Sequence, residues 1–424
     1  MSDNRLKIDI QSEIGTLNAV LLHSPGAEVE NMTPKMAQRA LYSDILNLSI
    51  AQHEYAQLQG VLSKQAKVYT VTGLLEKVLQ NPVEKERLVR RICEMEQLME
   101  YFDTLMEMTP ARLAKALIEG LPANINTLTA FLNEDYYALF PLYNFYFTRD
   151  AAVTIGNSAL ICKMANKVRM RESIIMEAIY RGSGEFECGI IDACDRQYLP
   201  NNNLFMEGGD ILIAREDIIL IGNGMRTSTQ GIDMLASRLS SIAPEGRKHI
   251  IVQQLPHSPE SFIHLDMVFT LLDRDKCMVF EPLILGDNQY QTVHITIDNG
   301  KVVKINSVSN ILTALKRLGM DLQPIVCGGK ADEWDQEREQ WHSGANFFAF
   351  APGKVLSYAR NTHTLAELSN HGFEIIPAWD VINGKTTLEG DRKCVVTIEG
   401  SELPRGGGGA RCMTMPLSRK AVNW

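Results

Sequence analysis

Short apolar runs and helical periodicities alternate along the chain. Residues 17–22 (LNAVLL) form an apolar run that Ser-Pro-Gly closes, which predicts a buried strand ending in a turn. Between residues 36 and 62 apolar positions recur every three or four residues, which predicts a helical region. A short strand is expected next at 68–71, ending at Gly73. This order of elements indicates a mixed α/β protein.

The stretch from 83 to 121 has a different character. Its apolar residues keep helical spacing, Glu, Lys and Arg fill many positions between them, and Thr109-Pro110 is typical of a helix start. Because this helical stretch lies between strand-rich regions, we predict a single domain over 1–424, interrupted by an inserted helical subdomain at about 76–140.

Strand pairs follow the helical stretch and recur. Three pairs flank short polar turns: 152–155 with 160–162, 211–214 with 218–221, and 293–297 with 302–305. Two stretches, after Ile221 and after Ser357, run from a strand into an arginine and then an amphipathic helix. Similar units begin near Asp150, Asp210, Asp266 and Asn346. This spacing predicts several copies of one supersecondary unit, packed side by side or in a ring.

Composition and charge narrow the class of protein. The 424 residues are 45% apolar and 22% charged, which is typical of a globular chain. The net charge of −9 argues against nucleic acid or an anionic membrane as a partner, so a small molecule is expected instead. The eight cysteines form no CxxC pair, which argues against a zinc site or a dense disulfide framework. A polar start and the lack of a long apolar run predict a cytoplasmic protein.

Two motifs place acidic residues beside a strand. In residues 147–150 (FTRD) an Arg-Asp pair stands at the mouth of a strand, and alone it would be a solvated strand end. In residues 206–210 (MEGGD) two glycines permit a close backbone approach between two carboxylates, although an ordinary turn would explain them equally well.

Two further motifs bring a histidine and a cysteine. Residues 263–269 (IHLDMVF) alternate as a strand would, which predicts that His264 and Asp266 share one face; alone, His264 could be a buried core residue. Near the end, four glycines lead to Cys412, whose neighbour Arg411 could favour the thiolate. A flexible linker is the alternative for the glycines.

The four motifs together favour one kind of substrate. They supply a cysteine, a histidine and at least three carboxylates without metal-like spacing, and so many carboxylates around a thiol suit a cation. A guanidinium group is planar and charged, and two carboxylates can hold its edges. A thiolate could add to its carbon, while a histidine protonates the departing nitrogen and then activates water.

Five segments, in this order and spacing, resemble bacterial arginine deiminases. They are NFYFTRD (144–150), MEGGD (206–210), GNGMRT (222–227), HLDMVFT (264–270) and RCMTMP (411–416). The N-terminal sequence from Ile14 is also similar, so the resemblance covers nearly the whole chain. It implies the pentein fold, a five-bladed α/β propeller of pseudo-fivefold ββαβ repeats with a helical insertion and a central active site.

The resemblance also implies roles for the residues of these motifs. Cys412 would be the nucleophile that forms an amidino-cysteine intermediate, and His264 the general acid and base. Asp150 and Asp266 would hold the guanidinium group, with Glu207 beside it.

Other residues would contact the amino-acid end of the substrate. The resemblance assigns this role to Asn144, Arg169 and Arg226, the two arginines providing charge for a carboxylate. Many family members also have an arginine five residues before the cysteine, where this chain has Gly407. Either Arg405, which we take as the candidate, or Arg411 could replace it.

The activity implied is hydrolysis of L-arginine to L-citrulline and ammonia, acting on a C–N bond of a linear amidine without metal or organic cofactor. It is the first step of arginine catabolism, the arginine dihydrolase pathway, and the family suggests a homo-oligomer, either dimer or tetramer. Alternatives are action on agmatine or a methylated arginine, amidino transfer to an amine, or a non-catalytic arginine sensor. Agmatine has no carboxylate for Arg169 and Arg226 to bind, which argues against it.

Overall fold

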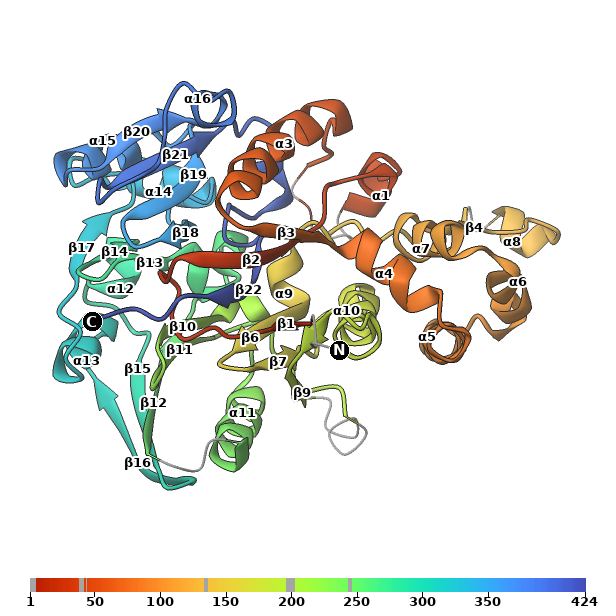
Figure 1. Ribbon diagram of the computed structural model, residues 1–424, viewed down its shortest axis with the longest axis horizontal. Helices are drawn as coiled ribbons and strands as arrows, with labels where there is room; N and C mark the ends of the chain where they lie inside the picture. Colours follow the sequence, from red (N-terminus) through yellow and green to blue (C-terminus); the bar gives the residue numbers. More distant parts are fainter. Residues whose placement is uncertain (1–4, 38–41, 43, 133–135, 196–202, 243–245) are drawn as a thin grey trace.

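The computed structural model describes residues 5–37, 42, 44–132, 136–195, 203–242 and 246–424 (Figure 1). Its strands and helices confirm a mixed α/β fold. No helix in these ranges is both long enough and apolar enough to cross a membrane.

Five sheets in the described residues share one pattern of connections. In each, two strands pair antiparallel and a third joins the second in parallel after at least one helix, as when α10 (Met170–Gly182) joins β7 (Ser158–Ile161) to β9 (Gly189–Asp192). The remaining strands are β6 (Ala152–Ile155); β10 (Ile211–Arg215), β11 (Ile218–Asn223) and β12 (Arg247–Gln254); β13 (Phe269–Asp273), β14 (Lys276–Val279) and β17 (Gln323–Val326); β18 (Phe348–Ala351), β19 (Lys354–Tyr358) and β21 (Cys394–Ile398); β22 (Met415–Arg419), β2 (Leu17–Leu22) and β3 (Lys67–Thr70). The predicted repetition of a strand pair followed by a helix is therefore present.

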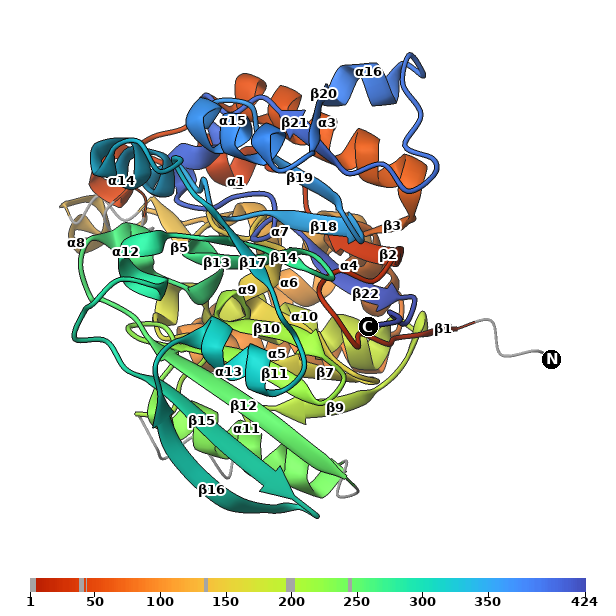
Figure 2. The same ribbon diagram turned by 90° about the vertical axis from the view of Figure 1, so that its left-hand side faces the viewer.

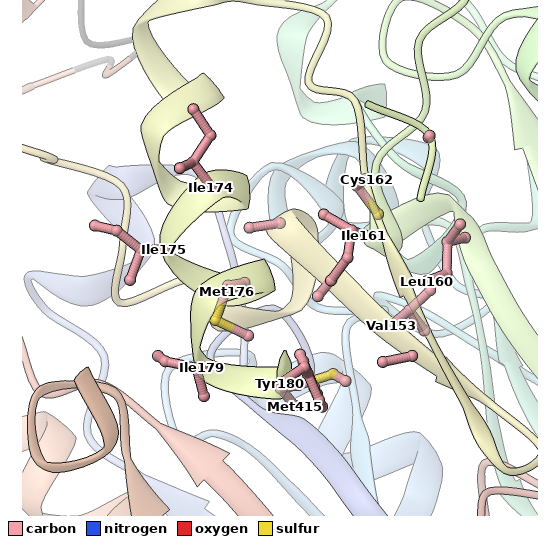
Figure 3. Packing of buried hydrophobic residues seen from close by; sticks show 14 of the residues in the cluster. Val153, Leu160, Ile161, Cys162, Ile174, Ile175, Met176, Ile179, Tyr180 and Met415 are labelled. Atoms are coloured by element: carbon pink, nitrogen blue, oxygen red, sulfur yellow. The ribbon is translucent and has the colours of Figure 1, made fainter. Parts of the chain in front are cut away.

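The crossover helices in four of the sheets are α3 (Leu48–Gln65), α11 (Thr229–Ile242), α13 (Ile311–Arg317) and α15 (Thr362–Asn370). In the fifth sheet, α10 packs against β7, and apolar side chains of both elements, such as Met176 and Ile161 in Figure 3, belong to one buried cluster. Because both faces of such strands are covered, their sequences are apolar runs, which is why the pattern predicted them.

The sheet that contains β22, β2 and β3 joins the two ends of the chain. Leu17 lies opposite Arg419 and Leu21 opposite Met415, while Ala19 pairs with Lys67 on the other side. The segment that precedes β22 carries Cys412, so this sheet fixes the position of the thiol.

One sheet carries an additional hairpin of β15 (Thr292–Asp298) and β16 (Lys301–Val308) beyond β12. Asn299 and Gly300 make the tight turn with positive φ, of 45° and 75°, which an Asn-Gly pair tolerates. The hairpin projects at the lower edge of the molecule in Figure 2. The three hairpins expected from the sequence are confirmed.

Helices dominate the stretch between β3 and β6. They are α4 (Val71–Leu79), α5 (Pro82–Glu96), α6 (Phe102–Glu107), α7 (Pro110–Glu119) and α8 (Leu128–Leu132), with the short strands β4 (Leu121–Pro122) and β5 (Tyr137–Leu139). Figure 1 shows α5 to α8 at one end of the molecule, while α10 packs against α4 and α5. Thr109 caps α7 as predicted, accepting a hydrogen bond from the Arg112 N–H.

Two local predictions near the N-terminus need correction. The strand expected at 68–71 ends at Thr70, whose hydroxyl caps α4, so Gly73 lies in a helix instead of ending the strand. The helix expected over 36–62 is divided into α2 (Pro34–Ala37) and α3, which Asn47 caps at its start. Residues 38–41 and 43 of that prediction lie outside the described residues.

Candidate active site

The five residues proposed for catalysis come together at the interior of the fold. Asp150 lies in the one-turn helix α9 (Thr148–Ala151), Glu207 precedes the 3-10 helix Gly208–Asp210, and Asp266 lies in the 3-10 helix Leu265–Met267. His264 precedes that last helix and Cys412 precedes β22. All five side chains are buried.

The strand predicted at 263–269 is wrong, because β13 begins only at Phe269. The Leu265 N–H donates to the Asp210 carboxylate at 2.9 Å, and the Met267 N–H donates to the His264 carbonyl at 3.1 Å. These bonds turn the backbone into a 3-10 helix. His264 and Asp266 therefore reach the same site through a turn and not through strand alternation.

Arg149 is also not the solvated strand end considered for the 147–150 motif. Its side chain is buried, and its Nε donates to the Arg411 carbonyl at 3.4 Å. The backbone N–H of Arg149 donates to the Cys412 carbonyl at 3.1 Å. Through these two hydrogen bonds Arg149 holds α9, which contains Asp150, against the segment that carries Cys412.

His264 is held between two carboxylates. Its Nε2 lies 3.0 Å from Glu207 Oε2 and its Nδ1 lies 3.7 Å from Asp150 Oδ1. Burial disfavours the charged ring, but the charge of Asp150 and the hydrogen bond with Glu207 outweigh it and raise the pKa of His264 to about 9. The imidazole is therefore protonated at neutral pH and can act as an acid.

Glu207 stays ionised beside this histidine. Burial raises the pKa of Glu207, but the charge of Arg226 and the hydrogen bond with His264 outweigh it, so that the pKa falls to about 2. A negative carboxylate therefore faces the imidazolium at neutral pH.

Cys412 is a thiol in this site. Its Sγ lies 3.6 Å and 3.9 Å from the two carboxylate oxygens of Asp266. Burial raises the pKa of the thiol well above its usual value, and the charges of Asp266 and Asp150 raise it further. The charge of Arg411 lowers the pKa of Cys412, as expected, but it does not overcome these effects.

Two carboxylates hold the Arg411 guanidinium. Its Nε and Nη2 each lie 3.0 Å from a Glu13 oxygen, and its Nη1 lies 2.8 Å from Asp266 Oδ2. Arg411 is fully buried, and it orients Asp266. The charge of Arg411 lowers the pKa of Cys412, but burial and the two aspartates prevail.

Two of the predicted substrate-binding arginines lie beside the carboxylates expected to act in catalysis. Arg169 Nη1 is 2.7 Å from Asp150 Oδ2, and its Nε and Nη2 bind Glu172 at 3.0 Å and 2.8 Å. Arg226 Nη1 is 3.4 Å from Glu207 Oε1. Asn144 is buried nearby, and its carbonyl accepts a hydrogen bond from Arg169 Nη2 at 3.4 Å. The structure thus brings Asn144, Arg169 and Arg226 together with the cluster.

Arg405 lies at the surface instead. Its side chain is 45% exposed, and its Nη1 forms an ion pair with Asp44 at 2.7 Å. The structure does not bring it into the buried cluster, whereas Gly406 and Gly407, the next residues, line a cavity together with Arg226.

That cavity, of about 430 Å³, lies beside the buried cluster, because Arg226 in its lining contacts Glu207. Besides Arg226, Gly406 and Gly407 it is lined by Ile263, the neighbour of His264. A wider groove of about 920 Å³ contains Arg405 but neither Arg226 nor Ile263. The smaller cavity is therefore the better candidate for the substrate entrance.

The glycine run packs closely against the site. A Cβ atom at Gly408 would lie 2.5 Å from the Phe147 ring, and one at Gly409 would lie 2.7 Å from Asn346. Gly407 has φ of +88°, a left-handed conformation that favours glycine. These glycines make close contacts with the interior, so a flexible linker does not describe them.

Asp150, Glu207 and His264 are also the group that could hold a metal ion. Within the described residues, their ligand atoms lie within 4.8 Å of one another. The two carboxylates already contact Arg169 and Arg226, which shows that they accept organic cations in this geometry.

Sequence reasoning missed four residues that support the site. They are Glu13, Glu172, Asp210 as a partner of Leu265, and Asn346. Glu172 could have been found, because it follows Arg169 by three residues, a spacing that pairs charges on a helix. Glu13 had no such signal, since 398 residues separate it from Arg411.

Comparisons with known proteins concern the chain as a whole. A family model described as arginine deiminase matches residues 38–419. The arginine deiminase of Bacillus cereus (strain ATCC 10987 / NRS 248) is 34% identical over 98% of this chain and 99% of its own length. The arginine deiminase of Staphylococcus aureus (strain JH9) is 30% identical over 100% of both chains.

Solved structures of low sequence identity share the fold. The amidinotransferase SxtG from Microseira wollei matches with a TM-score of 0.51 at 13% identity, covering 98% of both chains. The product-bound N-terminal domain of ArgZ, an arginine dihydrolase from Cyanobacteria, has a TM-score of 0.52 at 13% identity, covering 96% of this chain and 99% of that domain. Unliganded AgrE has a TM-score of 0.53 at 14% identity; the match covers 96% of this chain but only 40% of AgrE.

Proposed function

The chain belongs to the arginine deiminase family of hydrolases, and we propose that it converts L-arginine and water to L-citrulline and ammonia through Cys412, as the first step of arginine catabolism. One observation carries the proposal for the residues. A thiol, an imidazolium and three carboxylates are buried together beside two arginines, as a cationic substrate with a carboxylate end requires.

Part of this proposal concerns the architecture. The five sheets with one connection pattern are the blades of a pentein propeller, with the cluster at its centre. The shared connections and the likeness to the SxtG fold support this arrangement. The whole of 1–424 is one catalytic domain, and 76–140 is its helical insertion.

The substrate guanidinium would lie between Asp150 and Asp266. Asp266 already contacts Sγ, and Asp150 contacts His264, so a guanidinium bridging the two carboxylates has its carbon next to the thiol. A bound cation would also neutralise the two charges that raise the pKa of Cys412. Substrate binding therefore favours the thiolate.

The first chemical step forms a carbon–sulfur bond. Cys412 loses its thiol proton to solvent as the guanidinium binds, the thiolate adds to the guanidinium carbon, and His264 gives its proton to a terminal nitrogen. The C–N bond then breaks and ammonia leaves, which yields an amidino-cysteine and a neutral imidazole. The pKa of His264, about 9, ensures that this proton is present at neutral pH.

The second step releases the product. Neutral His264 removes a proton from water, and the hydroxide adds to the amidino carbon. The C–S bond breaks and the proton of the added hydroxyl passes to the departing sulfur, so that Cys412 returns to its thiol form and the carbon keeps the water oxygen as the ureido carbonyl of citrulline. The imidazolium is restored for the next turnover.

Recognition of the amino-acid end falls to Arg226, Arg169 and Asn144. Arg226 lines the entrance cavity and contacts Glu207, so it is placed to meet a carboxylate outside the cluster. Arg411 is held by Glu13 and Asp266. A role for Arg405 stays a prediction, as do a homo-oligomeric state and a cytoplasmic location.

Release of citrulline and ammonia from L-arginine tests the proposal, with agmatine and dimethylarginine in parallel and a chelator present. We expect citrulline from arginine alone, and none from Cys412→Ala or His264→Ala. An active Cys412→Ala protein would refute the nucleophile. Turnover of another guanidine would keep the mechanism but change the substrate.

A further inference from the structure

Asn346, in the loop between α14 (Glu333–Trp341) and β18, has a buried side chain inside the active site. Its Oδ1 accepts hydrogen bonds from the backbone N–H groups of Arg411 and Cys412, at 2.9 Å and 3.2 Å. Only the oxygen of the amide can accept these bonds, so the orientation of the side chain is settled by its partners.

The amide nitrogen consequently faces the nucleophile. Nδ2 lies 3.2 Å from Cys412 Sγ and 3.1 Å from the Asp266 carbonyl, with Met267 Sδ farther away at 3.7 Å. Its two hydrogens thus match its two nearest acceptors, one of which is the reacting sulfur.

We infer that Asn346 is a catalytic residue that donates a hydrogen bond to the thiolate of Cys412, while its oxygen fixes the backbone that carries the thiol. The inference deepens the proposed function and rests on the role of Cys412 as nucleophile.

The electrostatic setting explains why this donor matters. Burial and the charges of Asp266 and Asp150 disfavour a thiolate at Cys412. A cationic donor beside the sulfur would repel the guanidinium substrate, and the guanidinium of the adjacent residue, Arg411, is already paired with Glu13 and Asp266. A neutral amide stabilises the negative sulfur through a charge-assisted hydrogen bond and adds no positive charge that would compete with the substrate for Asp150 and Asp266.

The same side chain sets the geometry of attack. Asn346 binds the backbone of Asp266 and the backbone and sulfur of Cys412, so it links the group that holds the substrate to the group that attacks it. Gly409 permits this approach, because a Cβ atom there would lie 2.7 Å from Asn346. The contact between Asn346 and Cys412 therefore depends both on the amide of Asn346 and on the lack of a side chain at Gly409.

The substitution Asn346→Asp tests the hydrogen bond that Asn346 donates to the sulfur while it keeps the packing of the side chain. Aspartate keeps the size of asparagine and an oxygen for the two backbone N–H groups, but it has no N–H to donate and adds a charge beside the sulfur. A matched control is Asn361→Asp, because Asn361 is also buried but its Nδ2 donates to the His342 carbonyl at 3.1 Å.

The readout is the rate at which iodoacetamide alkylates Cys412 between pH 6 and pH 10. Cleavage after Arg411 and Arg419 releases a peptide that contains this cysteine alone, so mass spectrometry separates it from the other seven. We expect Asn346→Asp to move the pH profile upward and slow alkylation at pH 8 by about tenfold or more, since charged hydrogen bonds are the stronger ones. Asn361→Asp should stay within about twofold of the unsubstituted protein, because the Asn361 amide donates to the His342 carbonyl and not to Cys412.

Turnover measurements complete the test. We expect kcat to fall with the alkylation rate in Asn346→Asp, whereas KM changes less. An unchanged alkylation profile would overturn the inference even if turnover fell, because Asn346 would then act only in folding or packing. If circular dichroism shows that Asn346→Asp is unfolded, Asn346→Ala removes the donor without adding a charge, and an unchanged profile there overturns the inference equally.

Alkylation does not require catalysis, so the two proposals can fail separately. An unsubstituted protein that makes no citrulline would refute the proposed function. The alkylation profiles of the variants would still show whether Asn346 stabilises the thiolate.

Discussion

Glu13 offers the sharpest test of the buried charges behind the active site. Its carboxylate binds the Arg411 guanidinium through two contacts of 3.0 Å, and it is almost fully buried. Burial raises the pKa of Glu13, but the charges of Arg411, Arg149 and Arg419 outweigh it and lower the pKa to about 2. The substitution Glu13→Gln keeps the shape of the side chain and removes the charge that these arginines require.

The magnitude follows from proton linkage. The ordinary pKa of 4.5 exceeds the folded value of about 2, and each pH unit of this difference corresponds to about 1.4 kcal/mol, which gives about 3 kcal/mol. Because the folded pKa is the lower one, this stabilisation is fully present above pH 4.5 and is lost as the pH falls toward 2. We therefore expect Glu13→Gln to lower the free energy of unfolding by about 3 kcal/mol at pH 7.

Urea unfolding followed by tryptophan fluorescence measures this difference at pH 7 and again at pH 4. At pH 4 the gap between the two proteins should shrink by about 1 kcal/mol. The control is Asp44→Asn, which removes an exposed ion pair with Arg405 and should change the free energy of unfolding by less than about 1 kcal/mol. Equal losses in Glu13→Gln and Asp44→Asn, or a gap that does not depend on pH, would refute the reasoning.

Three further predictions concern catalysis. Asp266→Asn removes a charge that raises the pKa of the Cys412 thiol, so alkylation at neutral pH should become several-fold faster while turnover falls; slower alkylation would contradict this. Arg226→Ala should raise KM for arginine at least about tenfold, and more than Arg405→Ala, whose side chain is engaged at the surface; the reverse order in steady-state kinetics would assign carboxylate binding to Arg405. The proton needed from His264 is lost as the pH rises through about 9, so kcat/KM should fall on that side, and a flat profile to pH 10 would exclude His264 as the acid.

The sequence predicted those elements whose pattern depends on local contacts. Hairpins such as β10 with β11 appear as paired apolar runs because each strand is covered on both faces. The cap of α7 at Thr109 could also be predicted, because the N–H group that donates to its hydroxyl belongs to a residue only three positions away.

The errors occurred where a distant residue decides the outcome. The alternation at 263–269 indicated a strand. Instead, the backbone N–H of Leu265 donates a hydrogen bond to Asp210, which is 55 residues away. Arg411 lowers the pKa of its neighbour Cys412 as expected, but no pattern in the sequence indicated that Glu13, 398 residues away, binds its guanidinium. No periodicity carries such information, because these partners are set by how the sheets pack.

The pairing of β2 with β22 has a consequence for biosynthesis. β2 leaves the ribosome among the first strands, but its antiparallel partner lies at residues 415–419 and must be translated before that sheet can close. Until then one edge of β2 has no partner strand, and Cys412 is not yet in contact with the other residues of the site. A nascent or prematurely terminated chain is therefore inactive toward arginine, and its unpaired apolar edge makes it a substrate for chaperones or proteases.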